Sequence, residues 1–187
     1  MKIRPLRPAG RGGEVRTARP LRPVLAALAL VIGVLFAPGT GVIGGATDAF
    51  AATKISHATA TSMFRSSGIT WSSSGGCSDR SVATCTSFDQ LNLATAQGAQ
   101  TLKGALGCAM NITGGTETGH ASGTYSHWNG YKLDIGKTTC LTNYVKNTFT
   151  YIGLRGDGYP QWKSGAGNVY ADEGSHWDVT FYNCGGC

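Results

Sequence analysis

The cysteines restrict the possible folds more than any other feature of this sequence. There are six, at positions 77, 85, 108, 140, 184 and 187. An even number in an exported chain predicts a small domain held by three disulfides, for which fifteen pairings exist. We expect near neighbours to pair: Cys77 with Cys85, Cys108 with Cys140, and Cys184 with Cys187. The spacing lacks the two paired clusters of a thiolate zinc site, so we interpret all six as structural.

The beginning of the chain has the composition of an export signal. Seven Lys and Arg residues precede an uncharged apolar run at residues 24–37, and Ala49-Phe50-Ala51 offers a small-x-small cleavage site. A membrane anchor is the alternative, but a spanning helix needs about 20 apolar residues and Pro38-Gly39 interrupts this run. We therefore expect residues 1–51 to be a removable signal peptide, with no membrane anchor after cleavage and a secreted product.

Removal of residues 1–51 changes what the charge of the chain implies. The whole sequence carries a formal charge of +6, but residues 52–187 hold only nine basic and eight acidic side chains, and these are scattered. Neither a nucleic-acid footprint nor a polybasic membrane surface remains. We expect a monomer with no nucleic-acid partner.

The mature chain is long enough for one domain with a modest core. We interpret the Ser/Thr/Gly-rich residues 52–86 as an irregular N-terminal arm in which His57 is solvated. Residues 87–187 then form the domain proper. A helix is predicted from a Ser87 cap to a Gly107 stop, and a second amphipathic helix over residues 141–152.

Strands are predicted where apolar residues alternate, at residues 108–113, 131–135, 168–171 and 176–182. Residues 155–167 are rich in Gly and are predicted to be a loop. It contains Arg155-Gly156-Asp157, which we interpret as a chance match to an adhesion tripeptide.

Two of these strands bring candidate metal ligands to one side. In residues 131–135 the apolar side chains alternate with Lys132 and Asp134, so Asp134 faces away from the core while His127 approaches from the preceding loop. In the last strand His176 and Asp178 share the non-core side. Two imidazoles and a carboxylate, His127, His176 and Asp134, suit one zinc ion with a position left for water.

Other polar residues near these ligands are candidates for catalysis and binding. Glu173 lies three residues before His176 and is the candidate general base that takes a proton from water. Candidate substrate-binding residues are Ser126, Lys132, His120 and Asp178. Lys132 either polarises a carbonyl or binds a carboxylate, or it is a solvated lysine at the rim. The loop that carries His120 either holds substrate or is a polar surface excursion.

These residues resemble the zinc D-alanyl-D-alanine carboxypeptidases and related cell-wall endopeptidases, which share their core with the hedgehog signalling domain. The family pattern is a serine shortly before a histidine, a glycine three and an aspartate seven residues after it, then an acidic residue three before a second histidine. The chain matches it with Ser126, His127, Gly130, Asp134, Glu173 and His176, and the resemblance covers about residues 88–181. The family often has an arginine after the first strand, whereas residues 113–118 contain none, which leaves carboxypeptidase and endopeptidase specificity open.

The resemblance implies a small single α+β domain with a central antiparallel sheet flanked by helices. It implies that His127, Asp134 and His176 hold one zinc ion while Glu173 acts as base. The expected substrate is a D-amino-acid-containing peptide of peptidoglycan, in its stem peptides or cross-links, and the expected location is extracellular or cell-wall associated. Two alternatives remain: a secreted, zinc-stabilised binding module without turnover, and a metal-free, disulfide-rich binding protein or toxin.

Overall fold

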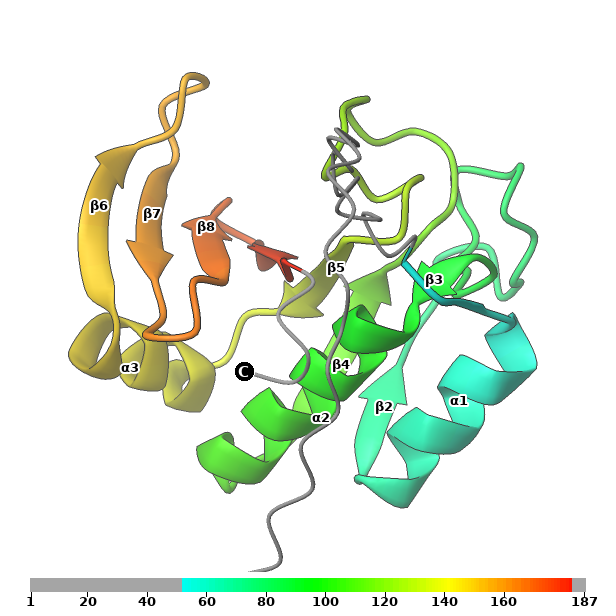
Figure 1. Cartoon of the computed structure of the whole chain (residues 1–187), viewed down its shortest axis with the longest axis horizontal. Coiled ribbons are helices and arrows are strands. Elements are labelled where there is room, and N and C mark those ends of the chain that lie inside the picture. The colour runs from blue at the N-terminus through cyan, green and yellow to red at the C-terminus, as the bar shows by residue number, and fades with distance from the viewer. Residues whose placement is uncertain (1–51, 183–187) are drawn as a thin grey trace, which may run out of the picture. The chain divides into compact units, whose positions relative to one another are not determined.

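A mixed β-sheet with helices packed against it forms the framework of residues 52–182, the part that this computed structural model describes (Figure 1). In chain order the elements are β1 (Lys54–Ile55), α1 (His57–Ser66), β2 (Ile69–Trp71), β3 (Leu91–Asn92), α2 (Leu93–Leu106), β4 (Met110–Gly114), β5 (Lys132–Gly136), α3 (Thr139–Thr148), β6 (Thr150–Leu154), β7 (Pro160–Lys163), β8 (Val169–Asp172) and β9 (His176–Thr180). The predicted signal peptide and the Cys184–Cys187 pair lie outside these residues.

The described residues place seven strands in one sheet, in the order β2-β4-β5-β9-β8-β7-β6. Every neighbouring pair is antiparallel except β2 and β4, which are parallel. Strands β1 and β3 form a separate antiparallel pair. The prediction of a small α+β domain with a largely antiparallel sheet flanked by helices is confirmed.

Alternation along β5 and β9 divides the core from the opposite face of the sheet. Leu133, Ile135, Trp177 and Val179 are fully buried, as the sequence pattern predicts. Helices α1 and α2 lie side by side across one end of the sheet in Figure 1. Gly98 of α2 packs against the Phe181 ring so closely that an added Cβ would lie 2.5 Å from it.

Two disulfides lie in the described part of the chain, and both match the predicted pairing. Cys77 is bonded to Cys85, and Cys108 is bonded to Cys140. The first closes a short loop, and the second joins the segment after α2 to the first turn of α3. Such bonds indicate an oxidising, extracellular type of environment. Between residues 52 and 182 no helix has the length and apolar character needed to cross a bilayer.

The irregular arm predicted for residues 52–86 is wrong over α1 and β2. Ser56 caps α1 by accepting a hydrogen bond from the Thr59 amide, and Ala60 and Phe64, four residues apart, are both fully buried. The ring of His57 stacks on Phe88, and its Nδ1 accepts a hydrogen bond from the Phe88 amide. His57 is therefore a packing residue rather than a solvated side chain.

Both predicted helices have different ends in the structure. Helix α2 begins at Leu93 and not at Ser87, because Gln90 has a positive φ of 62°, which an α-helix does not allow. The C-terminal stop at Gly107 is confirmed. Helix α3 ends at Thr148, so Ile152 belongs to β6, and part of the predicted loop at residues 155–167 is strand β7. The run Thr150-Tyr151-Ile152 favours a strand because its residues are β-branched or aromatic.

Candidate metal centre

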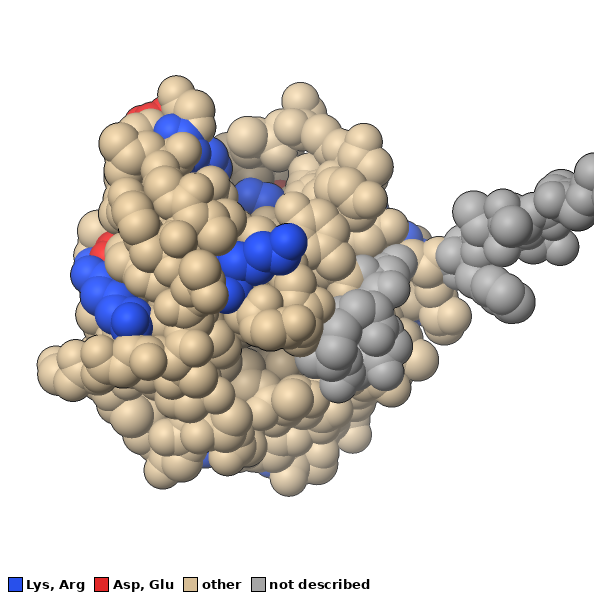
Figure 2. Space-filling model, turned by 60° about the vertical axis from the view of Figure 1, so that its left-hand side comes forward, with Lys and Arg blue, Asp and Glu red and all other residues tan. Residues whose placement is uncertain are grey.

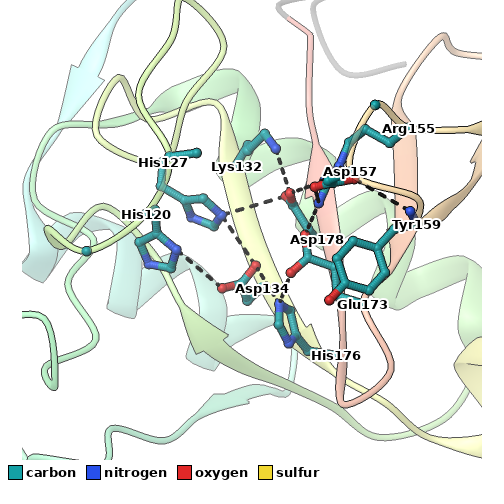
Figure 3. A pocket seen from close by; sticks show the side chains of 13 residues that line it. His120, His127, Lys132, Asp134, Arg155, Asp157, Tyr159, Glu173, His176 and Asp178 are labelled. Carbon is teal, nitrogen blue, oxygen red and sulfur yellow. Dashed lines mark hydrogen bonds and ion pairs between the residues drawn. The ribbon is translucent and has the colours of Figure 1, made fainter.

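A pocket of about 650 Å³ opens on the face of β5 and β9 that points away from the core. Its walls come from the loop around His120 and from the β6–β7 turn, residues 155–159 (Figure 3). Figure 2 shows Lys and Arg atoms around and inside a hollow of the molecular surface, while few acidic atoms are visible. The site therefore combines strand residues with residues from two loops.

The register of β5 and β9 sets the positions of the carboxylates. Asp134 is paired with Asp178, and Gly136 is paired with His176. Antiparallel partners present their side chains on the same face, so Asp134, Asp178 and His176 converge in the pocket as the sequence predicts. Asp134 and Asp178 are both buried, with relative exposures of 7% and 6%.

His127 is held by the turn that precedes β5. The Gly130 amide donates to the His127 carbonyl at 2.8 Å, and the Tyr131 amide donates to the Ser126 carbonyl at 3.1 Å. The imidazole Nδ1 lies 2.7 Å from the Gly115 carbonyl, and so carries the proton that this carbonyl accepts. Its Nε2 lies 3.3 Å from Asp134 Oδ1 and 3.6 Å from Asp178 Oδ1. A backbone carbonyl that accepts the proton of the other ring nitrogen is typical of metal-binding histidines.

His176 and Glu173 meet the same carboxylate from the other side. His176 Nε2 lies 3.5 Å from Asp134 Oδ1 and 3.2 Å from Glu173 Oε2. The other nitrogen, Nδ1, lies 3.0 Å from the Ser175 hydroxyl. All four residues of the predicted zinc site, His127, Asp134, Glu173 and His176, therefore line one pocket.

His120, a candidate for substrate binding, contacts the candidate metal ligands His127 and Asp134. Its ring stacks on that of His127 with centroids 3.8 Å apart, and its Nδ1 lies 3.7 Å from Asp134 Oδ2. Among residues 52–182, His120, His127 and Asp134 form the group whose ligand atoms all lie within 4.8 Å of one another, a group that could hold a metal ion. His176 is not part of this group, although it approaches Asp134.

Glu117 orients His120 from behind. Its carboxylate lies 3.2 Å from His120 Nε2 and accepts hydrogen bonds from the Ser87 and Gly115 amides. Burial raises the pKa of Glu117, but the contact with His120 and these amide donors outweigh burial and lower it. The sequence signal for this pair was present but not used, because Glu117-x-x-His120 has the same spacing as Glu173-x-x-His176.

Arg155 is the site residue that the sequence interpretation missed. Its guanidinium forms ion pairs with Glu173, with Asp157 at 2.7 Å, and with Asp178 at 2.8 Å. The tripeptide that the sequence indicates as a chance match therefore contributes all three of its residues to the pocket. The Asp157 contact, followed by those with Glu173 and Asp178, outweighs burial and raises the pKa of Arg155 further above its usual value.

The charges of the pocket compensate one another. Lys132 Nζ lies 2.6 Å from Asp178 Oδ2, so Lys132 is paired rather than solvated at the rim. Burial raises the pKa of Asp178, but His127 and Lys132 outweigh burial and hold it well below its ordinary value. Burial lowers the pKa of His127, yet the contacts with Asp134 and Asp178 prevail and raise it to about 9. Without a metal ion, a protonated His127 supplies positive charge between two carboxylates.

The donor atoms around Asp134 are of the types that bind a metal ion. Asp134 Oδ1 and Asp178 Oδ1 are buried, and neither makes a hydrogen bond. Buried oxygens of this kind call for a cation or a water. Asp134 Oδ1 lies 3.3 Å from His127 Nε2 and 3.5 Å from His176 Nε2, which is near the spacing of adjacent ligands of tetrahedral zinc, but His176 lies outside the group whose ligand atoms are all within 4.8 Å of one another.

Ser126 does not line this pocket, although it belongs to the sequence pattern. Its hydroxyl accepts a hydrogen bond from the Asn129 amide at 3.2 Å and so shapes the turn that presents His127. Asp178 and Lys132 do line the pocket, as predicted. Searches against protein-family models, curated proteins and solved structures found no match to this chain.

Proposed function

We propose that the protein is a secreted, zinc-dependent peptidase of the hedgehog/DD-peptidase type that hydrolyses D-amino-acid-containing peptides of peptidoglycan. One observation carries the proposal. His127, Asp134, Glu173 and His176 are spread over 50 residues of sequence, yet they line one open pocket with Asp134 at their centre. This placement supports the three ligands and the base that the sequence resemblance implies.

His127, Asp134 and His176 would hold the zinc ion in this proposal. Zinc, when bound, supplies Lewis-acid polarisation of a carbonyl and makes water more acidic. Glu173 would accept the proton of the attacking water at Oε2, the oxygen that lies beside His176. Arg155 binds the other oxygen of Glu173, Oε1, and so fixes the direction in which Oε2 points.

Two cations lie at the other end of the pocket. Arg155 and Lys132 both contact Asp178 Oδ2, which holds them close together. A pair of cations there would bind the peptide carbonyl or terminal carboxylate of a substrate. Arg155 would thereby replace the arginine that residues 113–118 lack, but from the β6–β7 turn. Both cations are already paired with Asp178, so their positions favour neither carboxypeptidase nor endopeptidase action.

Metal content and hydrolysis together test this proposal. Elemental mass spectrometry of oxidised protein without the signal peptide should find about one zinc per chain, lost in His127→Ala. Glu173→Gln should keep zinc and fold but lose hydrolysis of peptidoglycan fragments, because the amide cannot accept the proton. Asp79→Asn, an exposed change outside the pocket, is the matched control and should keep both. Full activity of Glu173→Gln would exclude Glu173 as the base.

A second comparison assigns the imidazole ligands. His176→Ala should lose stoichiometric zinc, whereas His120→Ala should retain it, because His176 and His127 approach the same oxygen of Asp134. The reverse result would move the metal to His120, His127 and Asp134.

His120 also favours a second candidate, a zinc-stabilised binding module. Four protein ligands are typical of a closed structural site, and His120 with Glu117 behind it has the geometry of a fourth ligand. In that case zinc would remain bound, and neither the wild type nor His120→Ala would hydrolyse any peptide.

A further inference from the structure

A second hollow of about 260 Å³ adjoins the metal centre. It shares Gly119 and His120 with the main pocket, and its remaining wall includes Trp128 and the polar residues Ser122, Ser126 and Asn129. It lies on the loop between β4 and β5, of which the proposed peptidase mechanism uses only His127. The two hollows therefore meet at His120.

The indole of Trp128 is exposed yet held in place. Its relative exposure is 48%, so about half of the side chain faces solvent. The guanidinium of Arg80 stacks on the ring, with Cζ 3.7 Å from a ring centroid. Arg80 also donates to the Thr116 carbonyl at 3.1 Å and to the Trp128 carbonyl. One face of the ring is therefore covered by Arg80, which is itself hydrogen-bonded to the backbone.

The Cys77–Cys85 disulfide is connected to the Trp128 ring through Arg80. Arg80 lies inside the loop that the disulfide closes, and the Thr118 amide donates to the Arg80 carbonyl at 2.8 Å. The stapled loop and the loop from β4 to β5 are therefore joined through Arg80. The disulfide therefore restrains the loop whose Arg80 stacks on Trp128.

The charges near the hollow select a neutral ligand. Glu117 is the acidic residue that lines it, and its carboxylate is already engaged by two backbone amides and by His120. Arg80 places a positive charge on one face of the indole, which disfavours a second cation on the other face. A neutral ligand with an apolar face and hydroxyl or amide edges fits an aromatic wall beside serine and asparagine side chains.

We propose that this hollow binds one sugar ring, a neutral N-acetylated hexosamine, of the glycan to which the peptide substrate is attached. A pyranose ring offers C–H groups to the indole face and hydroxyl or acetamido groups to the polar residues. The inference rests on the proposed function, because a sugar bound in this hollow would place the peptide attached to it beside His120, at the metal centre. The favoured substrate is then a glycan-linked peptide rather than a free one.

Calorimetric titration with a trimer of N-acetylglucosamine tests the subsite without any need for hydrolysis. The oxidised wild-type protein should bind the trimer saturably, and Trp128→Ala should weaken binding by about tenfold or more, the effect of losing a stacking platform. Trp128→Phe should restore most of the affinity, because it keeps an aromatic face. Tyr151→Ala removes an equally exposed aromatic residue from β6 and should bind as the wild type does.

Circular dichroism of each variant separates loss of binding from loss of fold. Absence of saturable binding by the wild type, or equal binding by Trp128→Ala, would overturn the subsite. The proposed function fails separately, if the zinc-loaded wild type hydrolyses no peptide while the trimer still binds. Hydrolysis of peptides without trimer binding would remove the subsite alone.

Discussion

Asp134 of β5 lies directly opposite Asp178 of β9 in the antiparallel register of the sheet. Like charges in opposed positions destabilise a strand pair. Here Lys132 and Arg155 neutralise one oxygen of Asp178, and His127 lies between the two carboxylates. The Oδ1 atoms of both aspartates still lack a hydrogen bond. The opposed carboxylates are therefore compensated by these neighbouring cations, and Asp134 also belongs to the group that could hold a metal ion.

Zinc should stabilise the folded protein through this pair. A ligand that binds only the native state adds about 2.7 kcal/mol at a concentration 100 times its Kd. Thermal unfolding of the oxidised wild type should therefore shift to a higher temperature with zinc and return with a chelator. Asp134→Asn should show no such shift, while Asp79→Asn should keep it. If zinc does not change the unfolding temperature of the wild type, the metal site is contradicted.

Gly114 provides the space for the Asp134 side chain. A Cβ at Gly114 would lie 2.4 Å from Asp134 Oδ2 and 3.1 Å from its Cβ. Gly114→Ala should therefore displace the carboxylate and lower zinc affinity by about 10–100-fold, measured by titration calorimetry. Gly104→Ala is the matched control, because a Cβ there meets nothing within 4 Å in helix α2. It should leave zinc affinity unchanged and raise stability by about 0.5–1 kcal/mol. Equal zinc affinity in both variants would show that Asp134 is not a ligand.

Gly130 has a structural role that its place in the sequence pattern does not reveal. Its φ is +76°, and an added Cβ would lie 2.5 Å from the Gln90 carbonyl and 2.8 Å from the Asn92 amide. Left-handed strain and a backbone clash together predict that Gly130→Ala lowers the free energy of unfolding by about 2–4 kcal/mol, as measured in urea. Gly158→Ala, with a φ of +92° but no neighbour within 4 Å, should lose only the strain component of about 1–2 kcal/mol. Similar losses in the two variants would mean that the clash at Gly130 is relieved.

The sequence predicted the parts of the site that depend on local alternation. The placement of Asp134 and Lys132 on one side of β5, and of His176 and Asp178 on one side of β9, follows from the period of a strand. Arg155 was missed because its approach to Asp178 depends on the pairing of β6 with β7 and of β8 with β9, which local pattern does not specify. The same region was assigned to helix and loop, because Phe149 and Ile152 continue the three- and four-residue spacing of α3.

The position of His120 likewise depends on contacts distant in sequence. The Glu117 carboxylate behind it is fixed by the Ser87 amide, 30 residues away. The sequence predicts a helix cap at Ser87, a local role, whereas in the structure the Ser87 amide donates to Glu117. Once that contact is known, the repeated Glu-x-x-His spacing becomes a usable signal for a second ligand pair.

The ion pairs of Asp172, at the end of β8, make the stability of the domain depend on pH. Its carboxylate lies 2.5 Å from Lys137 Nζ and 3.3 Å from Lys146 Nζ, and it accepts a hydrogen bond from the Gly174 amide. Burial raises the pKa of Asp172, but the Lys137 contact, the Gly174 amide and Lys146 outweigh burial and lower it below 3.8. Because the pKa is lower in the folded state, this stabilisation is present above about pH 4 and is lost as the pH falls through the folded-state pKa.

Asp172→Asn should therefore be less stable than the wild type at pH 7 by about 1–2 kcal/mol, and this difference should shrink toward pH 3. Urea unfolding of metal-free protein at pH 7, 5 and 3 measures the difference. Lys137→Met removes the nearest cation and should weaken the pH dependence in the same direction, which separates the ion pair from the amide contact of Gly174. A difference between wild type and Asp172→Asn that stays constant from pH 7 to pH 3 would show that the Asp172 charge does not stabilise the fold, because a purely steric effect of the substitution would not change with protonation.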